Sequence, residues 1–288
     1  MRGDPDDRTP EQLLSFGVVN LDKPPGPSAH QVAGWLRDLA GVNRAAHAGT
    51  LDPKVTGCLP TLLGDAVRLA QVFDDAIKEY VAVLELHGPP PADLDSVVAE
   101  FEGDIHQKPP RKSAVVRQLR TRRIHGLELL EVQDRQALLR IICESGTYVR
   151  KLCHDIGLAA GTGAHMGHLR RTATGTFNDT TLASIHDVHD AVVEWRERGD
   201  DAPLRAVVQP AERALTDIPR VQIAESAANQ VAEGAPVYAP GVLAAETDEL
   251  GTLVACYTPD GAAVCLGTLV GDPAADRGSV VNLERVLV

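Results

Sequence analysis

The spacing of apolar residues along the chain first predicts a set of strands. Apolar runs at 16–21 and 80–86 are typical of strands, and residues 57–70 form a longer segment typical of a buried core. Two further runs, at 127–132 and 137–143, are separated by a short polar turn, which predicts an antiparallel pair. The first half of the chain is therefore rich in strands.

Between these runs, apolar residues recur every three or four positions, which predicts helices. Ser28 is suited to cap the first helix, and Gly41 is suited to end it. The apolar face of that helix comprises Val32, Leu36 and Leu39. Further helices are predicted at 93–101, 147–160 and 181–195. This mixture of strands and helices predicts an α+β protein.

The pattern changes again near residue 200 and predicts a domain boundary. After Pro219 the chain shows short apolar runs separated by Gly and Pro turns, which predicts a small β-rich domain over 218–288. The main domain is placed at 15–210. Residues 1–14 are acidic and contain prolines, so they are interpreted as a short disordered tail.

Composition narrows the class of protein. Apolar residues make up 44% of the 288 positions, which allows a packed core, although only 3% are aromatic. The sequence has neither a secretory signal pattern nor an apolar run of about 18 residues, so no membrane association is expected. The five cysteines are odd in number and form no CxxC motif, which indicates neither a disulfide framework nor a metal site. A reducing cytoplasm fits this pattern.

The charge is strongly negative, at −12, which by itself argues against a polyanionic partner. The cations are mostly Arg and the acids mostly Asp, a bias that suits a protein living in high salt, where surface repulsion is screened within about 3 Å at 1 M. The charge is also unevenly distributed. Residues 105–127, called the basic strip below, contain no acid. Its basic residues are Lys108, Arg111, Lys112, Arg117, Arg120, Arg122 and Arg123. Either a solvated basic face or a phosphate-binding surface explains this strip.

Segment 47–57 is the sharpest local feature and reads His-Ala-Gly-Thr-Leu-Asp-Pro-Lys-Val-Thr-Gly. Pro53 favours an extended backbone at Asp52, and the flanking glycines permit a tight loop. The Asp52 carboxylate is thus either displayed towards a ligand or used to form a turn. A metal held by His47 and Asp52 lacks an evident third ligand nearby.

Two later segments also carry candidate chemistry. Tyr148 and Arg150 fall at the start of a predicted helix, where backbone amides could receive an anion and Arg150 could pair with a carboxylate from another loop. An ordinary helix start with a surface Arg is the alternative. Leu169, Arg170 and Arg171 follow a Gly-rich stretch that suits phosphate contact, although a solvated Arg pair fits equally well.

Taken together, these segments resemble the TruB/dyskerin family of pseudouridine synthases over residues 16–180. The matching motifs, in order, are Lys-Pro-Pro-Gly-Pro-Ser (23–28), the Asp52 segment (47–57), the strand around Tyr80 (78–88), and the segments 144–157 and 163–177. Residues 111–126 resemble the archaeal and eukaryotic guide-RNA branch. Residues 225–243 resemble the start of a PUA domain, a small RNA-binding β-barrel. With its acidic composition, the chain resembles a protein of a halophilic archaeon.

The resemblance implies a fold and a role for each site residue. It implies a catalytic domain with a mixed or antiparallel sheet and flanking helices, and a mobile RNA-gripping loop at about 105–127. Asp52 would be catalytic, either attacking C1′ of the ribose or removing the 2′ proton, and Arg150 would hold it ionised. Tyr80 would stack on a flipped uracil. His47, Tyr148 and Leu169 would bind the substrate, Lys23 and Pro24 would be structural supports, and Arg111, Lys112, Arg117, Arg120, Arg122, Arg123, Arg170 and Arg171 would contact the RNA backbone.

The implied reaction converts uridine to pseudouridine and needs no cofactor or metal. The implied substrate is tRNA, at uridine 55, or rRNA, or both, the rRNA being modified within an H/ACA guide ribonucleoprotein in which this chain would be a monomer. That complex implies guide RNA and small accessory proteins: a zinc-ribbon type, a β-barrel type and a kink-turn-binding type. Two alternatives are a non-catalytic RNA-binding scaffold and an unrelated hydrolase that uses Asp52 as its nucleophile.

Overall fold

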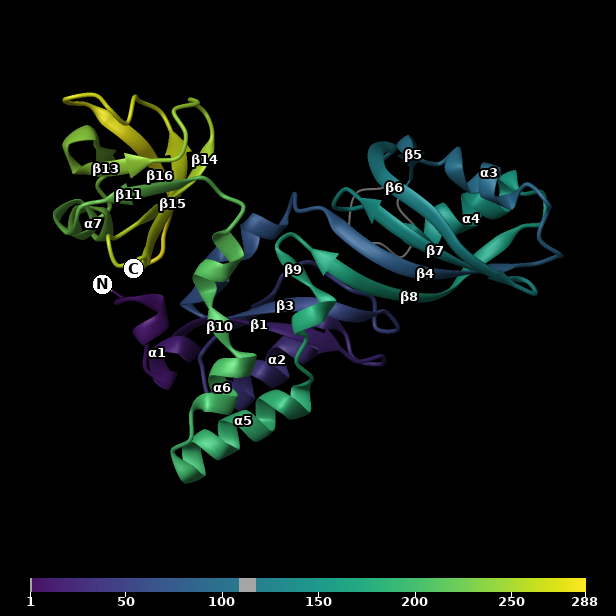
Figure 1. Ribbon diagram of the computed structural model, residues 1–288, viewed down its shortest axis with the longest axis horizontal. Helices are drawn as coiled ribbons and strands as arrows, with labels where there is room; N and C mark the ends of the chain where they lie inside the picture. The colour runs from purple at the N-terminus through teal and green to yellow at the C-terminus, as the bar shows by residue number, and fades with distance from the viewer. Residues whose placement is uncertain (1, 109–117) are drawn as a thin grey trace.

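The computed structural model describes residues 2–108 and 118–288, which form two β-sheets with helices around them (Figure 1). The larger sheet has the strand order β10-β1-β3-β8-β4-β7-β6-β5, and β2 and β9 pair with β3 and β8. Only β3 and β8 run parallel among these pairs, so the sheet is mixed. Its strands are β1 (Phe16–Lys23), β2 (Ala45–His47), β3 (Thr56–Gly64), β4 (Lys78–Leu86), β5 (Gly103–Gln107), β6 (Arg120–Gln133), β7 (Gln136–Cys143), β8 (Ala164–Thr174), β9 (Phe177–Asn178) and β10 (Gln209–Pro210).

The smaller sheet lies at the C-terminal end of the chain and has the order β12-β16-β15-β14-β11-β13. Its strands are β11 (Arg220–Ile223), β12 (Val237–Tyr238), β13 (Val242–Ala245), β14 (Leu253–Tyr257), β15 (Ala263–Leu269) and β16 (Ser279–Val286). The helices of the described residues are α1 (Pro10–Ser15), α2 (Ala29–Ala40), α3 (Leu94–Ala99), α4 (Val149–Ala159), α5 (Ile185–Arg198), α6 (Ala202–Val207) and α7 (Glu225–Ala232). The predicted α+β class and mixed sheet are confirmed.

Helix α2 shows how local sequence signals fix an element. The Ser28 side chain accepts a hydrogen bond from the Gln31 amide, and the Gln31 side chain accepts one from the Ser28 amide, so the two form a capping box. Gly41 ends the helix in the left-handed conformation at φ 70°. Val32 and Leu36 are fully buried, as the apolar spacing predicts.

The N-terminal segment differs from its prediction as a disordered tail. Residues 10–15 form α1, in which Thr9 and Gln12 make a capping box and Pro10 occupies the first turn. Leu13 and Leu14 are buried in the main core. The Arg8 side chain is 2% exposed and makes two hydrogen bonds of 2.7–2.8 Å with the Glu212 carboxylate. The segment is ordered because Leu13, Leu14 and the Arg8–Glu212 ion pair are buried. The acidic composition of the segment gave no indication of this burial.

The same segment helps join the two sheets. Glu212 also accepts a hydrogen bond from the Ala263 amide of β15, at 3.1 Å, so the Arg8–Glu212 pair contacts the smaller sheet. One hydrophobic cluster contains Phe16 of β1 together with Leu266 and Leu287 from the C-terminal region. The N-terminal and C-terminal segments lie near each other (Figure 1), and the Arg2 guanidinium donates a hydrogen bond to the Leu287 carbonyl.

Two predicted boundaries are corrected, one by strand pairing and one by a helix cap. Part of the segment expected at about 105–127 to be a mobile loop is strand, because β5 pairs with the first residues of β6, with Gln107 opposite Arg120. Of the residues between these strands, 109–117 lie outside the described residues, and with them the predictions for Arg111, Lys112 and Arg117. The helix predicted at 181–195 begins at Ile185, because Ser184 caps it.

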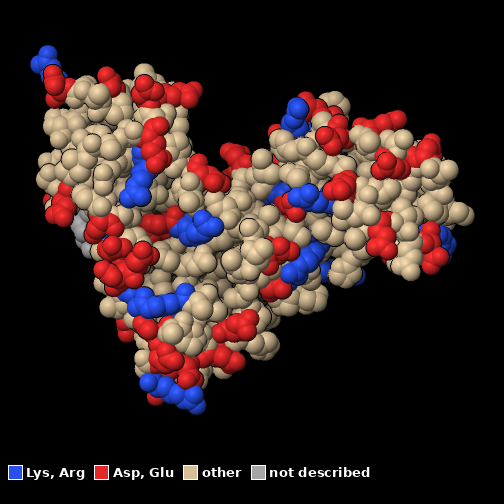
Figure 2. Space-filling model, viewed as in Figure 1, with Lys and Arg blue, Asp and Glu red and all other residues tan. Residues whose placement is uncertain are grey.

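The described residues contain no helix long and apolar enough to cross a membrane. Acidic side chains are spread over most of the face shown in Figure 2, with arginines and lysines between them. On this face the acidic side chains are therefore spread out and are not gathered in one tail.

Candidate active site

Asp52 lies at a β-turn between two buried anchors. Leu51 and Val55 are 4% and 3% exposed, whereas the Asp52 side chain between them is 52% exposed. The Val55 amide donates to the Asp52 carbonyl at 3.0 Å, which closes the turn around Pro53. Both interpretations of Asp52 from the sequence therefore hold together: its backbone forms the turn, and the turn displays its carboxylate.

The side chain of Lys23 holds this turn in place through backbone carbonyls. Its side chain is fully buried, and Nζ donates to the carbonyls of Pro24, Pro53 and Val55 at 2.9–3.0 Å, which uses all three of its N–H donors. Burial lowers the pKa of Lys23, while the nearby Asp52 carboxylate acts in the opposite direction. These contacts fit the structural role that the resemblance implied for Lys23 and Pro24.

Arg171 fastens the other side of the loop, which corrects its predicted role as an RNA-backbone contact. The residue is 1% exposed on β8, and its guanidinium donates to the carbonyls of Cys58 at 2.7 Å and Ala48 at 3.2 Å. A Cβ on Gly49 would lie 3.3 Å from this guanidinium, and Gly49 has φ +84°, so the loop needs glycine there. Strand alternation turns Arg171 inward, and an RNA phosphate could not reach it.

Arg150 supplies the counter-charge to Asp52. It lies in the first turn of α4, and its guanidinium donates to the Asp52 carboxylate across 98 positions of sequence. The predicted pairing of Arg150 with a carboxylate from another loop is thus seen in the structure. This charge-assisted hydrogen bond fixes the direction of the Asp52 carboxylate.

His47 stands at the end of β2, a short strand inside the region predicted as loop. Its Nδ1 is buried and has no hydrogen-bond partner among the described residues. Burial lowers the pKa of His47, and the nearby His30 and Arg171 act in the same direction. His47 is therefore favoured in its neutral form.

Tyr80 and Leu169 come from adjacent strands and lie on one face of the sheet. Tyr80 of β4 pairs with Arg171 of β8, and Ala82 pairs with Leu169, so the side chains of each pair point to the same side. Burial raises the pKa of Tyr80, and the charge of the nearby Arg171 acts in the opposite direction. Both Tyr80 and Leu169 pack in the main core cluster. Arg171 thus links the Asp52 loop to the tyrosine.

Tyr148 is not free to receive an anion through its amide, as the sequence suggested it could be. The Tyr148 N–H donates to the Gln107 side-chain oxygen at 2.9 Å, and Gln107 Nε2 donates back to the Tyr148 carbonyl at 3.2 Å. Sequence reasoning missed Gln107 because no local pattern marks it. Its one available signal was its position as an uncharged polar residue at the end of β5.

The remaining basic residues occupy different environments. Arg170 points to the opposite side of β8 from Arg171 and holds the Asp22 carboxylate with two hydrogen bonds of 2.9 and 3.2 Å. Arg123 is exposed and pairs with Asp104 at 3.2 Å, whereas Arg120 and Arg122 are half-buried. The described part of the basic strip therefore lies mostly in two paired strands, in which Arg120 and Arg122 are partly covered and Arg123 is exposed.

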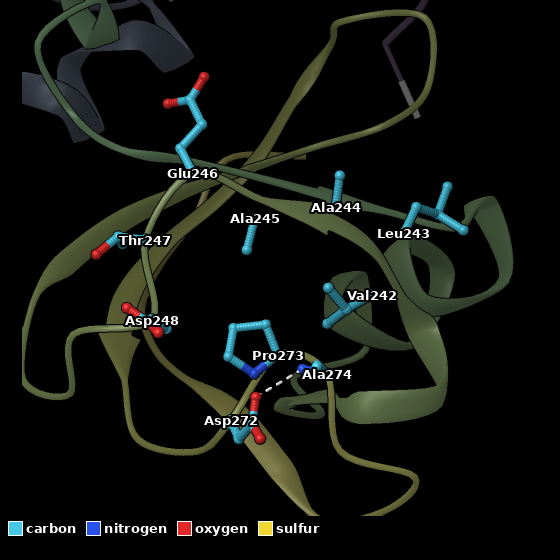
Figure 3. A pocket seen from close by; sticks show the side chains of 10 residues that line it. All are labelled: Val242, Leu243, Ala244, Ala245, Glu246, Thr247, Asp248, Asp272, Pro273 and Ala274. Atoms are coloured by element: carbon cyan, nitrogen blue, oxygen red, sulfur yellow. Dashed lines mark hydrogen bonds between the residues drawn. The ribbon is translucent and has the colours of Figure 1, made fainter.

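A hollow beside β13 in the smaller sheet is chemically different (Figure 3). Among its ten lining residues are three acids, Glu246, Asp248 and Asp272, and no lysine, arginine or histidine. The Asp272 carboxylate accepts a hydrogen bond from the Ala274 amide at 2.8 Å and so stabilises its own turn. Nothing in this hollow would hold a carboxylate ready for reaction, so the candidate site is the one at Asp52.

The Asp52 site brings together residues from four separated parts of the chain. It offers a half-exposed carboxylate held by a guanidinium, and a carboxylate can act as a nucleophile or a general base. Arg171, which bonds to the Asp52 loop, lies on the same sheet face as Tyr80 and Leu169, an aromatic ring and an aliphatic side chain of the kinds that suit a flat ring system. Such a combination suits chemistry on a planar ligand next to a carboxylate.

Known protein families match this chain along almost its whole length. Two blocks, 37–89 and 87–149, match the model for the "TruB family pseudouridylate synthase (N terminal domain)". Residues 150–216 match the "tRNA pseudouridylate synthase B C-terminal domain". Residues 3–33 match the "DKCLD (NUC011) domain", and 219–287 match the "PUA domain".

Individual proteins are similar over nearly their full length. A "Probable tRNA pseudouridine synthase B" of Haloarcula marismortui is 66% identical over 295 aligned positions, covering 100% of this chain and 94% of the relative. The solved "Cbf5-Nop10-Gar1 Complex" has a chain that is 42% identical with a TM-score of 0.92, covering 100% of this chain and 89% of that one. An "H/ACA RNP bound to a substrate RNA containing 2'-deoxyuridine" has a chain that is 41% identical with a TM-score of 0.91, covering 99% and 90%.

Proposed function

The chain belongs to the TruB family of pseudouridine synthases, and from that membership we propose that it isomerises uridine to pseudouridine in tRNA and in guide-directed ribosomal RNA. It is an RNA pseudouridine synthase, an isomerase. The family resemblance inferred from its motifs is thereby confirmed. The observation that carries the reaction is the Asp52 carboxylate, displayed on a fastened turn and paired with Arg150.

The geometry suggests how the site residues divide the reaction between them. The reaction breaks the bond between C1′ and N1, turns the uracil, and joins C1′ to C5, while one proton moves from C5 to N1. The Asp52 carboxylate starts the reaction, either at C1′ or at the 2′ proton, and the hydrogen bond from Arg150 keeps it oriented. The target uridine leaves its stack to reach the turn. Tyr80 then stacks on the uracil, a contact worth about 1–3 kcal/mol.

The second part of the proposal concerns which RNA molecules the enzyme modifies. The relatives' name points to tRNA, and the solved neighbours point to an H/ACA ribonucleoprotein with a substrate RNA. We propose that the chain serves both, acting on uridine 55 of tRNA and, as a catalytic subunit with guide RNA, on rRNA. Small accessory proteins of the kind named in the similar Cbf5-Nop10-Gar1 complex would join it in the guided mode.

We also propose that the protein works in concentrated salt. The net charge of −12, the excess of Arg over Lys and the similarity to a Haloarcula protein support this proposal. At about 1 M salt, charges are screened within about 3 Å, so an acidic enzyme can approach RNA without strong long-range repulsion.

The test is to incubate the purified chain with a tRNA transcript, and separately with guide RNA, accessory proteins and an rRNA fragment, at molar KCl. Pseudouridine would be mapped by chemical modification and primer extension. We expect a new pseudouridine at position 55 of the tRNA and at the guided position of the rRNA fragment. Product in one reaction only would restrict the substrate to that RNA. Absence of product in both would reject the proposed activity and favour the non-catalytic scaffold.

A further inference from the structure

Gln107 is a buried polar residue whose side chain binds the backbone of a distant residue. It is the last residue of β5 and is only 2% exposed. Its amide side chain makes two hydrogen bonds to the backbone of one residue: it accepts from the Tyr148 amide at 2.9 Å and donates to the Tyr148 carbonyl at 3.2 Å. A single side chain thus satisfies both backbone groups of Tyr148.

The residue that it holds is the N-cap of α4. Tyr148 has φ −94° and ψ 93°, and its own side chain makes no capping hydrogen bond. The amides of Lys151 and Leu152 begin the helix by donating to the Tyr148 carbonyl at 2.9 and 3.0 Å. The amide of an N-cap residue has no partner within its helix, so Gln107 supplies one from another strand. The start of α4 is consequently fixed from outside the helix.

The turn that precedes Tyr148 is fixed to the neighbouring strand in a similar way. The Glu144 amide donates to the Arg123 carbonyl at 3.0 Å, and the Arg123 amide donates to the Glu144 carboxylate at 3.1 Å. The turn is therefore held at one end by β6 and at the other end by Gln107 of β5. Because Arg150 follows Tyr148 by only two positions, any shift of this end moves the guanidinium that meets Asp52.

We propose that Gln107 is a positioning residue for the Asp52 reaction: it holds the start of α4 so that Arg150 meets Asp52 and Tyr148 faces the target base. This inference rests on the proposed function. Gln107 itself touches neither the carboxylate nor the expected substrate position, so it acts through Tyr148 and Arg150. Misplacement of a reacting group by about 1 Å can reduce a rate by about 100-fold.

The test compares three variants. Gln107→Met has a similar length without either hydrogen bond, and Gln107→Glu keeps the acceptor but loses the donor to the Tyr148 carbonyl. The matched control is Gln136→Met on β7, where the exposed Gln136 donates only to the Glu85 carboxylate at 2.7 Å. Each variant is assayed for single-turnover rate at saturating RNA, for RNA dissociation constant, and for amide hydrogen exchange across residues 144–152.

We expect Gln107→Met to speed exchange at the Tyr148 amide by about tenfold or more and to slow the single-turnover rate by about 10- to 100-fold. RNA affinity should stay within about threefold, and Gln107→Glu should fall between Met and the wild type. Gln136→Met should leave rate and exchange unchanged. A merely structural residue would lower the melting temperature without separating the rate from the affinity.

A double-mutant cycle with Arg150→Ala identifies the route. If Gln107 acts through Arg150, Gln107→Met should slow the Arg150→Ala enzyme by less than about twofold, because the coupled group is already absent. Equal losses in both backgrounds, a wild-type rate for Gln107→Met, or unchanged exchange at Tyr148 would each overturn the inference. If the wild type forms no pseudouridine, the proposed function fails, while hydrogen exchange still decides whether Gln107 holds the helix start.

Discussion

The Asp52 turn and the hollow beside β13 are both surface loops that display carboxylates, yet they are built in opposite ways. Buried Lys23 and Arg171 hold the Asp52 turn through its backbone carbonyls, which leaves the carboxylate to Arg150. In the β13 hollow, Asp272 uses its own carboxylate to bind the Ala274 amide, and the lining contains no cation (Figure 3). A displayed acid becomes available for chemistry when other residues hold the loop in place.

The adjacent pair Arg170 and Arg171 shows the same contrast at the level of single residues. Arg171 is 1% exposed and bonds to backbone carbonyls, whereas the Arg170 side chain is 37% exposed and pairs with Asp22. The side chains of consecutive residues on a strand point to opposite faces of the sheet, so Arg171 points into the interior and Arg170 points to the surface. The two arginines therefore provide matched variants for testing which contacts hold the site.

The largest effect is expected from the acid itself. Asp52→Asn should slow pseudouridine formation by about a thousandfold or more, because the amide is neither a base nor a nucleophile. RNA affinity should change little. Asp272→Asn, in the β13 hollow, should leave the rate unchanged. Normal turnover by Asp52→Asn, measured by tritium release from 5-tritiated uridine in tRNA, would remove Asp52 from the mechanism.

The next largest effect should come from the buried arginine. Arg171→Met should lower the free energy of unfolding by about 3 kcal/mol, since each buried carbonyl left unpaired costs about 1–3 kcal/mol. It should also slow the reaction, because the Asp52 loop and Tyr80 lose their common partner. Arg170→Met should cost only about 0–1 kcal/mol, as for other partly exposed ion pairs. Denaturant melts of both variants test this contrast, which equal losses would contradict.

A smaller effect is expected from the described arginines of the basic strip. Substituting Gln for Arg120, Arg122 and Arg123 in one triple variant should weaken RNA binding. The slope of the logarithm of the binding constant against the logarithm of the salt concentration should become smaller, by up to about one for each RNA phosphate that is no longer neutralised. A surface control is Arg198→Gln on α5, where the arginine pairs with Glu194. Binding measured over a salt series decides between the two interpretations of the strip, and an unchanged slope would favour a solvated face.

The smallest effect concerns pH and His47. Burial lowers the pKa of His47 in the folded protein, so below about 6.5 the unfolded chain binds a proton that the folded chain resists. The free energy of unfolding should therefore fall as the pH drops through that region. The His47→Gln variant should lose less of this free energy than the wild type does. Melting temperatures between pH 5 and 8 at constant ionic strength measure the difference. Parallel curves for the two proteins would show that His47 contributes nothing.

The candidate site could be predicted from sequence only in part. Pro53 and the glycines indicated a loop at Asp52 and left open whether its carboxylate is displayed or forms the turn, and the ordered motifs selected Asp52, Arg150, Tyr80 and Leu169 by resemblance. The role of Arg171 was missed, because an arginine beside another arginine gives no sign of which one is buried. Gln107 was missed because its partner lies 41 positions away. Arg171 and Gln107 both make hydrogen bonds to backbone atoms of distant residues, and no pattern of side chains in the sequence indicates such bonds.

The sequence by itself determined the α+β class, the cap and end of α2, the β6–β7 pair and the family. These follow from local periodicity, capping residues and ordered motifs. Only the tertiary structure decided that α1 is ordered, that the basic strip is largely strand where described, and that Lys23, Arg171 and Gln107 support the site. The reason is physical: burial and hydrogen bonding of a polar group depend on which distant backbone atoms surround it.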